Sequence, residues 1–215
     1  RCPYVVTEAL QGAAAGQLAL GADGIVLYNY YAADEDNARI RICTKENMRA
    51  DYSAIRSVGD LEALRGKPKQ YALTTVLGPV WNPPFDTPDQ LPVILEPDWR
   101  RAFRLPMCAE PTDRGLELIV QVVVDRRNGL PPIGLSFNDC WPTFIAKATD
   151  KLLFPQKDHT HHVPDYAAFN YSFDVARIAE GWNEISIYNG CHDRETGQER
   201  RDNSITVRSL ELAVK

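Results

Sequence analysis

The chain has 215 residues and 44% of them are hydrophobic, which is enough to fill the core of one large domain or two small ones. The formal net charge is -5, and the Lys and Arg residues are scattered among acids instead of forming the basic stripe that binds phosphates, so nucleic acid is not an expected partner. No apolar run approaches the roughly 20 residues that cross a bilayer, so the sequence also predicts no insertion into a membrane.

The first predicted elements are a helix and a buried strand. Residues 7–20 are rich in Ala and Gly, with Thr7 placed to cap the helix and Gly21 placed to end it in a left-handed conformation. Residues 24–28 are almost wholly apolar, which predicts a strand buried on both faces. A helix that leads into such a strand through about three residues is typical of a parallel α/β sheet or barrel.

A polar loop and a second helix complete the first third of the chain. Residues 31–45 are charged and show little periodicity, which predicts a long loop. Asp60 is placed to cap a short helix over residues 61–65, and Gly66 is placed to end it.

Beyond residue 70 the pattern changes to short β-rich runs separated by Pro, Gly, Asn and Asp. These runs favour an antiparallel sandwich or jelly roll with Leu118, Val120, Val122, Ile185, Ile187, Val207 and Leu212 in its core. The alternation in the last run slips near Arg208, which predicts a β-bulge. The predicted strands cover residues 71–77, 93–95, 101–105, 116–124, 133–137, 152–154, 169–173, 184–188 and 204–214.

Three stretches resemble known sugar-processing proteins. Residues 21–30, Gly-Ala-Asp-Gly-Ile-Val-Leu-Tyr-Asn-Tyr, resemble the last strand of glycoside-hydrolase-like (β/α)8 barrels, and residues 58–67 resemble the closing helix of the same proteins. Residues 180–187 are similar to the penultimate turn and strand of galactose-binding-like jelly rolls. The resemblance implies an α/β fragment, the last βα units of a TIM-type barrel, over residues 1–70, followed by an all-β sandwich or jelly roll over residues 71–215.

The resemblance implies a part of a glycoside-hydrolase-like protein. A (β/α)8 barrel needs about 250 residues, so at least the first six strands are missing and the chain alone is expected to be inactive. The start, Arg-Cys-Pro-Tyr, has no initiator Met and no apolar signal region, which predicts the interior of a longer protein. We therefore expect a C-terminal segment whose sandwich braces the barrel or binds carbohydrate, with the rest of the barrel or another chain as its partner. The alternatives are a non-catalytic carbohydrate-binding or structural module, and a subunit that completes a barrel with another chain.

The barrel-like part offers four candidate site residues. Glycoside hydrolysis normally uses two carboxylates, and Glu8 is the one candidate, because it follows the position of a seventh barrel strand. Its alternative role is to interact with the helix dipole. Tyr28, Asn29 and Tyr30 lie at the end of the presumed eighth strand, where side chains can contact a sugar. Their alternative roles are to close the top of the barrel and to bond the backbone of a turn.

The sandwich offers one further candidate, Trp141, in a turn that also contains Asn138 and Asp139 as partners for sugar hydroxyls. Burial in the core is its alternative. Other aromatic residues that could stack on sugars are Trp81, Trp99, Phe144 and Trp182.

No metal and no cofactor are predicted. Residues 158–162 hold an Asp and three His at close spacing, but they lie between two prolines and read as a solvated loop. The five cysteines show no CxxC spacing and are expected to be reduced. A single disulfide between Cys140 and Cys191 is the alternative.

Overall fold

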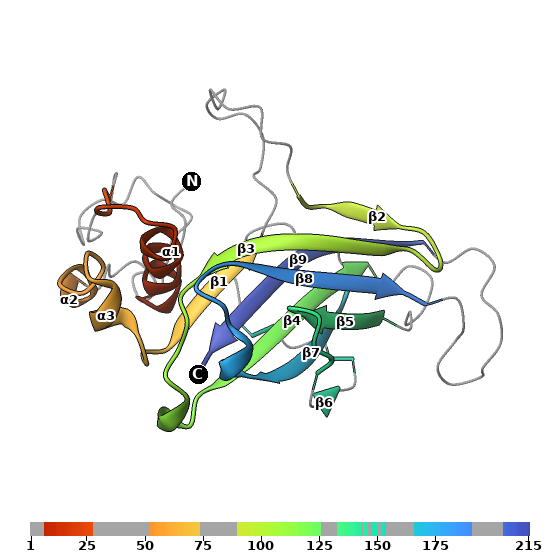
Figure 1. Ribbon diagram of the computed structural model, residues 1–215. Helices are drawn as coiled ribbons and strands as arrows, with labels where there is room; N and C mark the ends of the chain where they lie inside the picture. The colour runs from red at the N-terminus through yellow and green to blue at the C-terminus, as the bar shows by residue number, and fades with distance from the viewer. Residues whose placement is uncertain are drawn as a thin grey trace.

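The computed structural model describes residues 7–27, 52–73, 90–125, 133–142, 144–145, 148–149, 152–153, 166–190 and 204–215. These residues form two antiparallel β-sheets packed face to face, with a group of helices at one end (Figure 1). The predicted β-sandwich is therefore confirmed. The barrel is not: every strand pairing among the described residues is antiparallel.

The larger sheet has six strands in the order β1–β9–β4–β7–β6, with β2 also paired to β9. The smaller sheet has the order β3–β8–β5 and lies in front in Figure 1. The strands of the larger sheet are β1 (Lys69–Leu73), β2 (Val93–Leu95), β4 (Glu117–Asp125), β6 (Phe144–Ile145), β7 (Tyr166–Asp174) and β9 (Ile205–Val214). Those of the smaller sheet are β3 (Arg100–Met107), β5 (Ile133–Phe137) and β8 (Gly181–Asn189).

The core lies between the two sheets and follows from the alternation of apolar residues along each strand. All seven residues that we expected in the core, on β4, β8 and β9, are buried there. The strand that we expected at residues 152–154 is wrong for residues 152–153, because no strand forms there. Instead the backbone N–H of Leu153 donates to the side chain of Gln121 over 2.9 Å.

The predicted bulge in β9 is confirmed. Val123 pairs with Ser209 and Val124 pairs with Val207, so Arg208 is the extra residue. Its guanidinium group makes two contacts with the carboxylate of Asp125, at 2.7 and 2.6 Å, in a bidentate ion pair. The bulge therefore directs Arg208 toward the end of β4.

Helix α1 (Thr7–Ala19) ends as the sequence predicted. Gly21 has a φ of 92°, its N–H donates to the Leu18 carbonyl over 2.9 Å, and the Ala22 N–H donates to the Gln17 carbonyl over 3.2 Å. These two bonds form a Schellman motif. No helix among the described residues is long and apolar enough to cross a membrane.

Two glycines bring α1 close to both sheets. A Cβ at Gly12 would overlap the backbone carbonyl of Gln70 in β1, and a Cβ at Gly16 would lie 2.6 Å from the carbonyl oxygen of Pro106 in β3. Only glycine allows this approach, so α1 lies across the end of the sandwich (Figure 1). The domain boundary at residue 70 stays a prediction. The first strand, β1, begins at Lys69.

The other helices are short. Helix α2 (Tyr52–Ile55) and helix α3 (Leu61–Leu64) pack beside α1, and two 3-10 turns lie at Thr112–Arg114 and Val175–Arg177. The Asp60 cap of α3 is confirmed, because its carboxylate accepts the N–H groups of Glu62 and Ala63 at 3.0 and 3.2 Å.

The buried strand expected at residues 24–28 is wrong for residues 24–27. These residues form no strand, and the Val26 side chain is 93% exposed. Ile25 and Leu27 pack partly against the helices, so one side of the segment is covered. A parallel strand needs hydrogen-bonding neighbours on its edges, and the described residues supply no parallel strand beside it.

Candidate functional site

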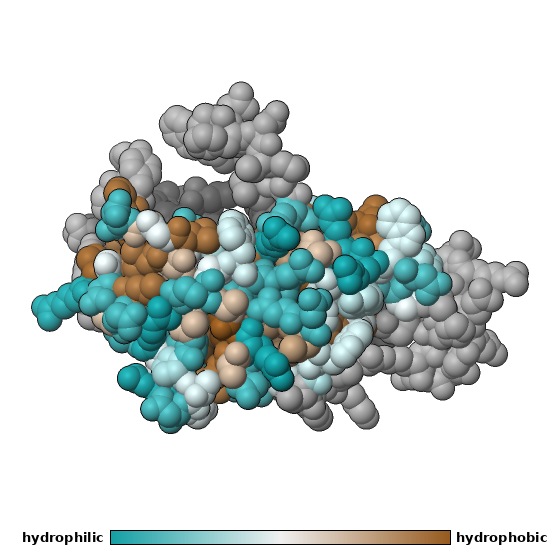
Figure 2. Space-filling view, in the orientation of Figure 1, coloured by the Kyte–Doolittle hydropathy of each residue, from teal (hydrophilic) through white to brown (hydrophobic). Residues whose placement is uncertain are grey.

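The smaller sheet has one face packed in the core and one directed outward. Phe103, Leu105, Ile185 and Ile187 point into the core, so the alternate residues of β3, β5 and β8 make up the outer face. Figure 2 is viewed onto this sheet, whose surface is mainly hydrophilic, whereas hydrophobic surface gathers over the helices. The outer face consists of Arg100, Ala102, Arg104, Pro106, Gly134, Ser136, Trp182, Glu184, Ser186 and Tyr188.

The strand register divides the outer face into rows across the sheet. Gly134, Tyr188 and Arg100 form the first row, and Ser136, Ser186 and Ala102 form the second. Glu184 is paired with Arg104 in the third row, and Trp182 with Pro106 in the fourth. Aromatic rows therefore flank a middle of small and charged side chains.

Trp141 lies over the first row. Its ring centroid is 5.5 Å from that of Tyr188 with an angle of 33° between the planes, and its side chain remains 65% exposed. On the other side of Tyr188 the Arg100 guanidinium lies 5.9 Å from the ring centroid and donates to the hydroxyl group over 3.4 Å. That hydrogen bond raises the pKa of Arg100, which stays charged. The three side chains form a continuous row with Trp141 as its exposed end.

A tight turn holds Trp141 in this position. Phe137 and Cys140 exchange both backbone hydrogen bonds at 2.9 Å, and the two residues between them have φ values of 46° and 61°. A two-residue turn with both φ values positive is a type I′ hairpin turn, which Asn and Asp favour. The chain therefore folds back over β5. A Cβ at Gly134 would lie 3.7 Å from the Trp141 ring, so the ring rests close to the sheet.

Asn138 serves this turn and is not available to a sugar, which corrects the role we expected for it. Its amide nitrogen donates to the Arg177 carbonyl at 2.8 Å and to the Asn183 side chain at 2.7 Å. Its side-chain oxygen accepts the N–H of Glu184 at 2.8 Å. Asp139 remains exposed beside the row. The polar groups that a ligand can reach are thus Asp139 and the charged residues of β3 and β8.

The other predicted site residues have different outcomes. Glu8 lies half buried in the first turn of α1, the position where a carboxylate interacts favourably with the helix dipole. Its catalytic role stays a prediction. Tyr28, Asn29 and Tyr30 lie outside the described residues, as do Trp81 and residues 158–162, and the side chain of Phe144 is not described. Within the described ranges no group of three or more His, Cys, Asp or Glu residues could hold a metal ion.

The two cysteines that the structure describes, Cys108 and Cys140, are free thiols. Cys191, the other cysteine of the alternative disulfide, lies outside the described residues.

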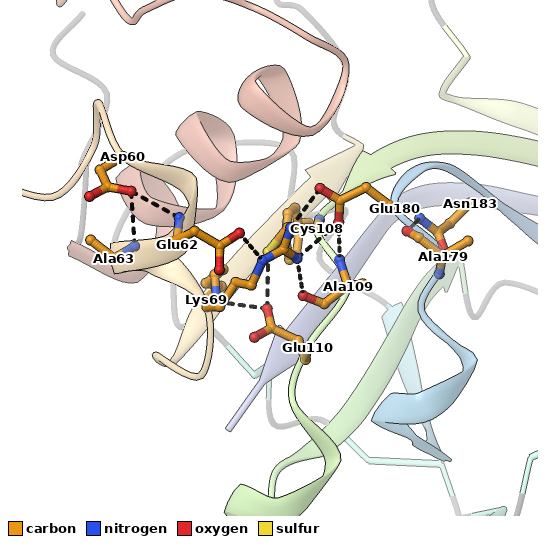
Figure 3. Close-up of polar contacts among 12 residues, drawn as sticks. Asp60, Glu62, Ala63, Lys69, Cys108, Ala109, Glu110, Ala179, Glu180 and Asn183 are labelled. Carbon is orange, nitrogen blue, oxygen red and sulfur yellow. Dashed lines mark hydrogen bonds and ion pairs between the residues drawn. The ribbon is translucent and has the colours of Figure 1, made fainter.

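A second polar cluster joins the helices to the sandwich (Figure 3). The Lys69 amine and the Glu110 carboxylate are 2.7 Å apart, with both side chains 0% exposed. Glu110 also accepts the Gly66 N–H at 2.7 Å and the Cys108 thiol at 3.2 Å. Burial raises the pKa of Cys108 to about 11, so it is a protonated thiol at neutral pH and a poor nucleophile.

Burial likewise raises the pKa of Tyr71, whose hydroxyl lies 3.5 Å from the Cys108 sulfur. Because these groups have no contact with solvent, substrate cannot reach them. The cluster serves stability.

The clamp formed by Arg65 and Glu180 extends this junction. Two nitrogens of the Arg65 guanidinium contact the two Glu180 oxygens at 2.9 Å each, and one of them also donates to the Ala109 carbonyl at 2.6 Å. The Ala109 N–H donates to Glu180 at 2.7 Å. The hydrogen bonds from Arg65 lower the pKa of Glu180. Residues from the α3 end, the β3 end and the β8 start are thereby joined, and the helical segment is fastened to the sandwich.

Sequence reasoning identified Trp141 but missed its neighbours. Tyr188 and Arg100 carry no motif, and what brings them together is the pairing of β3 with β8. The sequence signal for Tyr188 and Arg100 was that each alternates with buried residues along its strand. Lys69 and Glu110 gave no signal, because nothing in the sequence links a Lys and a Glu so far apart.

Comparisons with known proteins give a limited result. No family model matches the chain, and no curated protein matches it. Two solved structures, of the wild-type form and of a variant of a protein called BuGH86, each in complex with neoagarooctaose, align with 11% identity and a TM-score of 0.37. Each alignment covers 68% of this chain and 19% of the other chain. A TM-score of this size does not establish a shared fold.

Proposed function

We propose that the chain is a C-terminal segment of a glycoside-hydrolase-like protein, in which the sandwich binds carbohydrate on its outer face and braces the helical segment. The observation that carries the proposal is the exposed Trp141 ring, held over Gly134 and beside Tyr188 by the hairpin turn. Sugar rings present apolar C–H faces that pack on exposed aromatic rings, and their hydroxyl groups pair with charged and polar neighbours.

Two further observations support the bracing role. The buried Lys69–Glu110 pair and the Arg65–Glu180 clamp connect residues on both sides of the junction. The resemblance at residues 21–30 leads us to assign residues 1–70 to a parent barrel. Glu8, Tyr28, Asn29 and Tyr30 remain candidates for its substrate site.

Replacing Trp141 with Ala is expected to abolish most of the carbohydrate binding. Central aromatic anchors of an interface commonly account for 2 kcal/mol or more, so the affinity should fall at least tenfold. Affinity electrophoresis of the purified chain against gels that contain a panel of soluble polysaccharides measures this loss.

Trp99→Ala is the matched control. Trp99 is also exposed but lies one residue before Arg100, so it alternates to the other side of the chain and its loss should leave binding unchanged. Retention of wild-type affinity by the Trp141 variant, or no binding of any polysaccharide by the wild-type chain, would contradict the proposal.

A further inference from the structure

The outer face carries aromatic side chains at both of its ends. Trp182 lies on β8 with the same alternation as Tyr188 and is 57% exposed. The two residues are six positions apart, which corresponds to about 20 Å along a strand. Trp141 and Tyr188 thus mark one end of an extended surface and Trp182 marks the other, where β8 approaches α1.

The surface between these ends consists of small and charged residues. Its accessible groups are the exposed Ala102 and the charged pair of Arg104 and Glu184, whose nearest side-chain atoms are 3.9 Å apart. The small Ser136 and Ser186 are buried. The Ser186 hydroxyl donates to Glu184 over 3.4 Å, which holds that carboxylate close to the sheet. The long side chains of the outer face between the aromatic ends are therefore those of Arg104 and Glu184.

The charges on this surface balance. Arg100 and Arg104 are cationic, while Glu184 and the nearby Asp139 are anionic. Guanidinium groups only donate hydrogen bonds and carboxylates only accept them, so such pairs match sugar hydroxyl groups, which do both. A ligand with sulfate or carboxylate groups would gain from the two arginines and lose from the two acids. A neutral glycan fits this pattern better.

We infer that the outer face binds a linear, neutral glycan chain of several sugar units that runs along β8 from Trp141 to Trp182. This inference rests on the proposed function and specifies its ligand. Trp141 with Tyr188 provides the primary contact, and Trp182 provides a second contact that only a chain of about 20 Å reaches. Linking two contacts through one ligand raises its affinity well above that of either contact alone.

The test uses neutral oligosaccharides from disaccharide to octasaccharide, prepared from a neutral polysaccharide that the wild-type chain binds. Isothermal titration calorimetry should show affinity that rises with length and then levels off. Trp182→Ala should reduce the affinity for the octasaccharide at least tenfold and leave the affinity for the disaccharide unchanged. Trp182→Tyr should restore most of the loss, because a tyrosine ring also stacks. Trp141→Ala should lower the affinity for both the disaccharide and the octasaccharide.

Several outcomes would overturn the inference while leaving carbohydrate binding itself intact. One is equal affinity for the disaccharide and the octasaccharide, and another is an unchanged octasaccharide affinity in a Trp182→Ala variant that melts as the wild type does. A third is tighter, salt-dependent binding of a sulfated derivative of the same glycan, since screening by salt marks an ionic contribution. Failure of the wild-type chain to bind any glycan would instead refute the proposed function.

Discussion

Replacing Lys69 with Met should destabilise the protein by about 3–5 kcal/mol at pH 7, because it leaves the Glu110 carboxylate buried without its cation. Both side chains are 0% exposed, so water cannot solvate the charge that remains. Glu110 would keep its bonds from Gly66 and Cys108, which are neutral donors and offset only part of the loss. Urea unfolding followed by circular dichroism gives the free energy of unfolding directly.

Two variants accompany this measurement. The double variant Lys69→Met with Glu110→Gln removes both charges and should recover much of the stability, since a buried ion pair often contributes little net. Arg104→Met breaks an exposed pair and should cost less than about 1 kcal/mol. A loss below 1 kcal/mol for Lys69→Met would show that the buried pair does not hold the junction together.

The free energy of unfolding should fall as the pH rises from about 4.5 to about 7, because of the buried carboxyl group of Glu211. This residue lies in the middle of β9, opposite Gln121 of β4, and its burial raises the carboxyl pKa from 4.5 to about 7. The folded state therefore binds the proton more tightly than the unfolded state. Its contribution is most favourable below about pH 4.5, declines between pH 4.5 and 7, and is lost above, for a total of about 3 kcal/mol.

Substituting Glu211 with Gln removes this titration. Relative to the wild type, the Gln variant should gain about 2–3 kcal/mol in free energy of unfolding between pH 5 and pH 8. Denaturant unfolding at a series of pH values measures the difference. Glu184→Gln, at a partly exposed position of β8, is the matched control for the substitution itself. Parallel profiles for the wild type and the Glu211 variant would mean that the carboxyl group ionises normally in the fold.

The strands were predictable from the sequence where local pattern determines structure. The limits of β2 and β5 agree with the expected ranges, because apolar alternation and flanking turn residues define both ends. The bulge at Arg208 was also predictable, since an extra residue shifts the alternation by one. The absence of a strand at residues 24–27 was not predictable, because an apolar run forms a buried strand only with neighbours on both edges, and local sequence does not show those neighbours.

The candidate site was predictable only in part, for a related reason. Trp141 was found because its turn residues favour positive φ, which is a local property. Tyr188, Arg100 and the charged pair on β3 and β8 come together through register, and register depends on which strands pair. The buried Lys69 is the extreme case, because its charge gives no sign that it lies inside the protein.

The position of β9 has a consequence for synthesis on the ribosome. β1 and β2 have β9 as their partner in the larger sheet, although both are translated long before it. At about 5–20 residues per second, their edges and apolar side chains stay uncovered until Ile205–Val214 emerges. β4 and β7 can pair earlier, as can the strands of the smaller sheet. Nascent chains arrested before Ile205 should therefore be cleaved rapidly by a protease in β1 and β2. Chains released after Val214 should resist it, and equal resistance of the two would show that the larger sheet forms without β9.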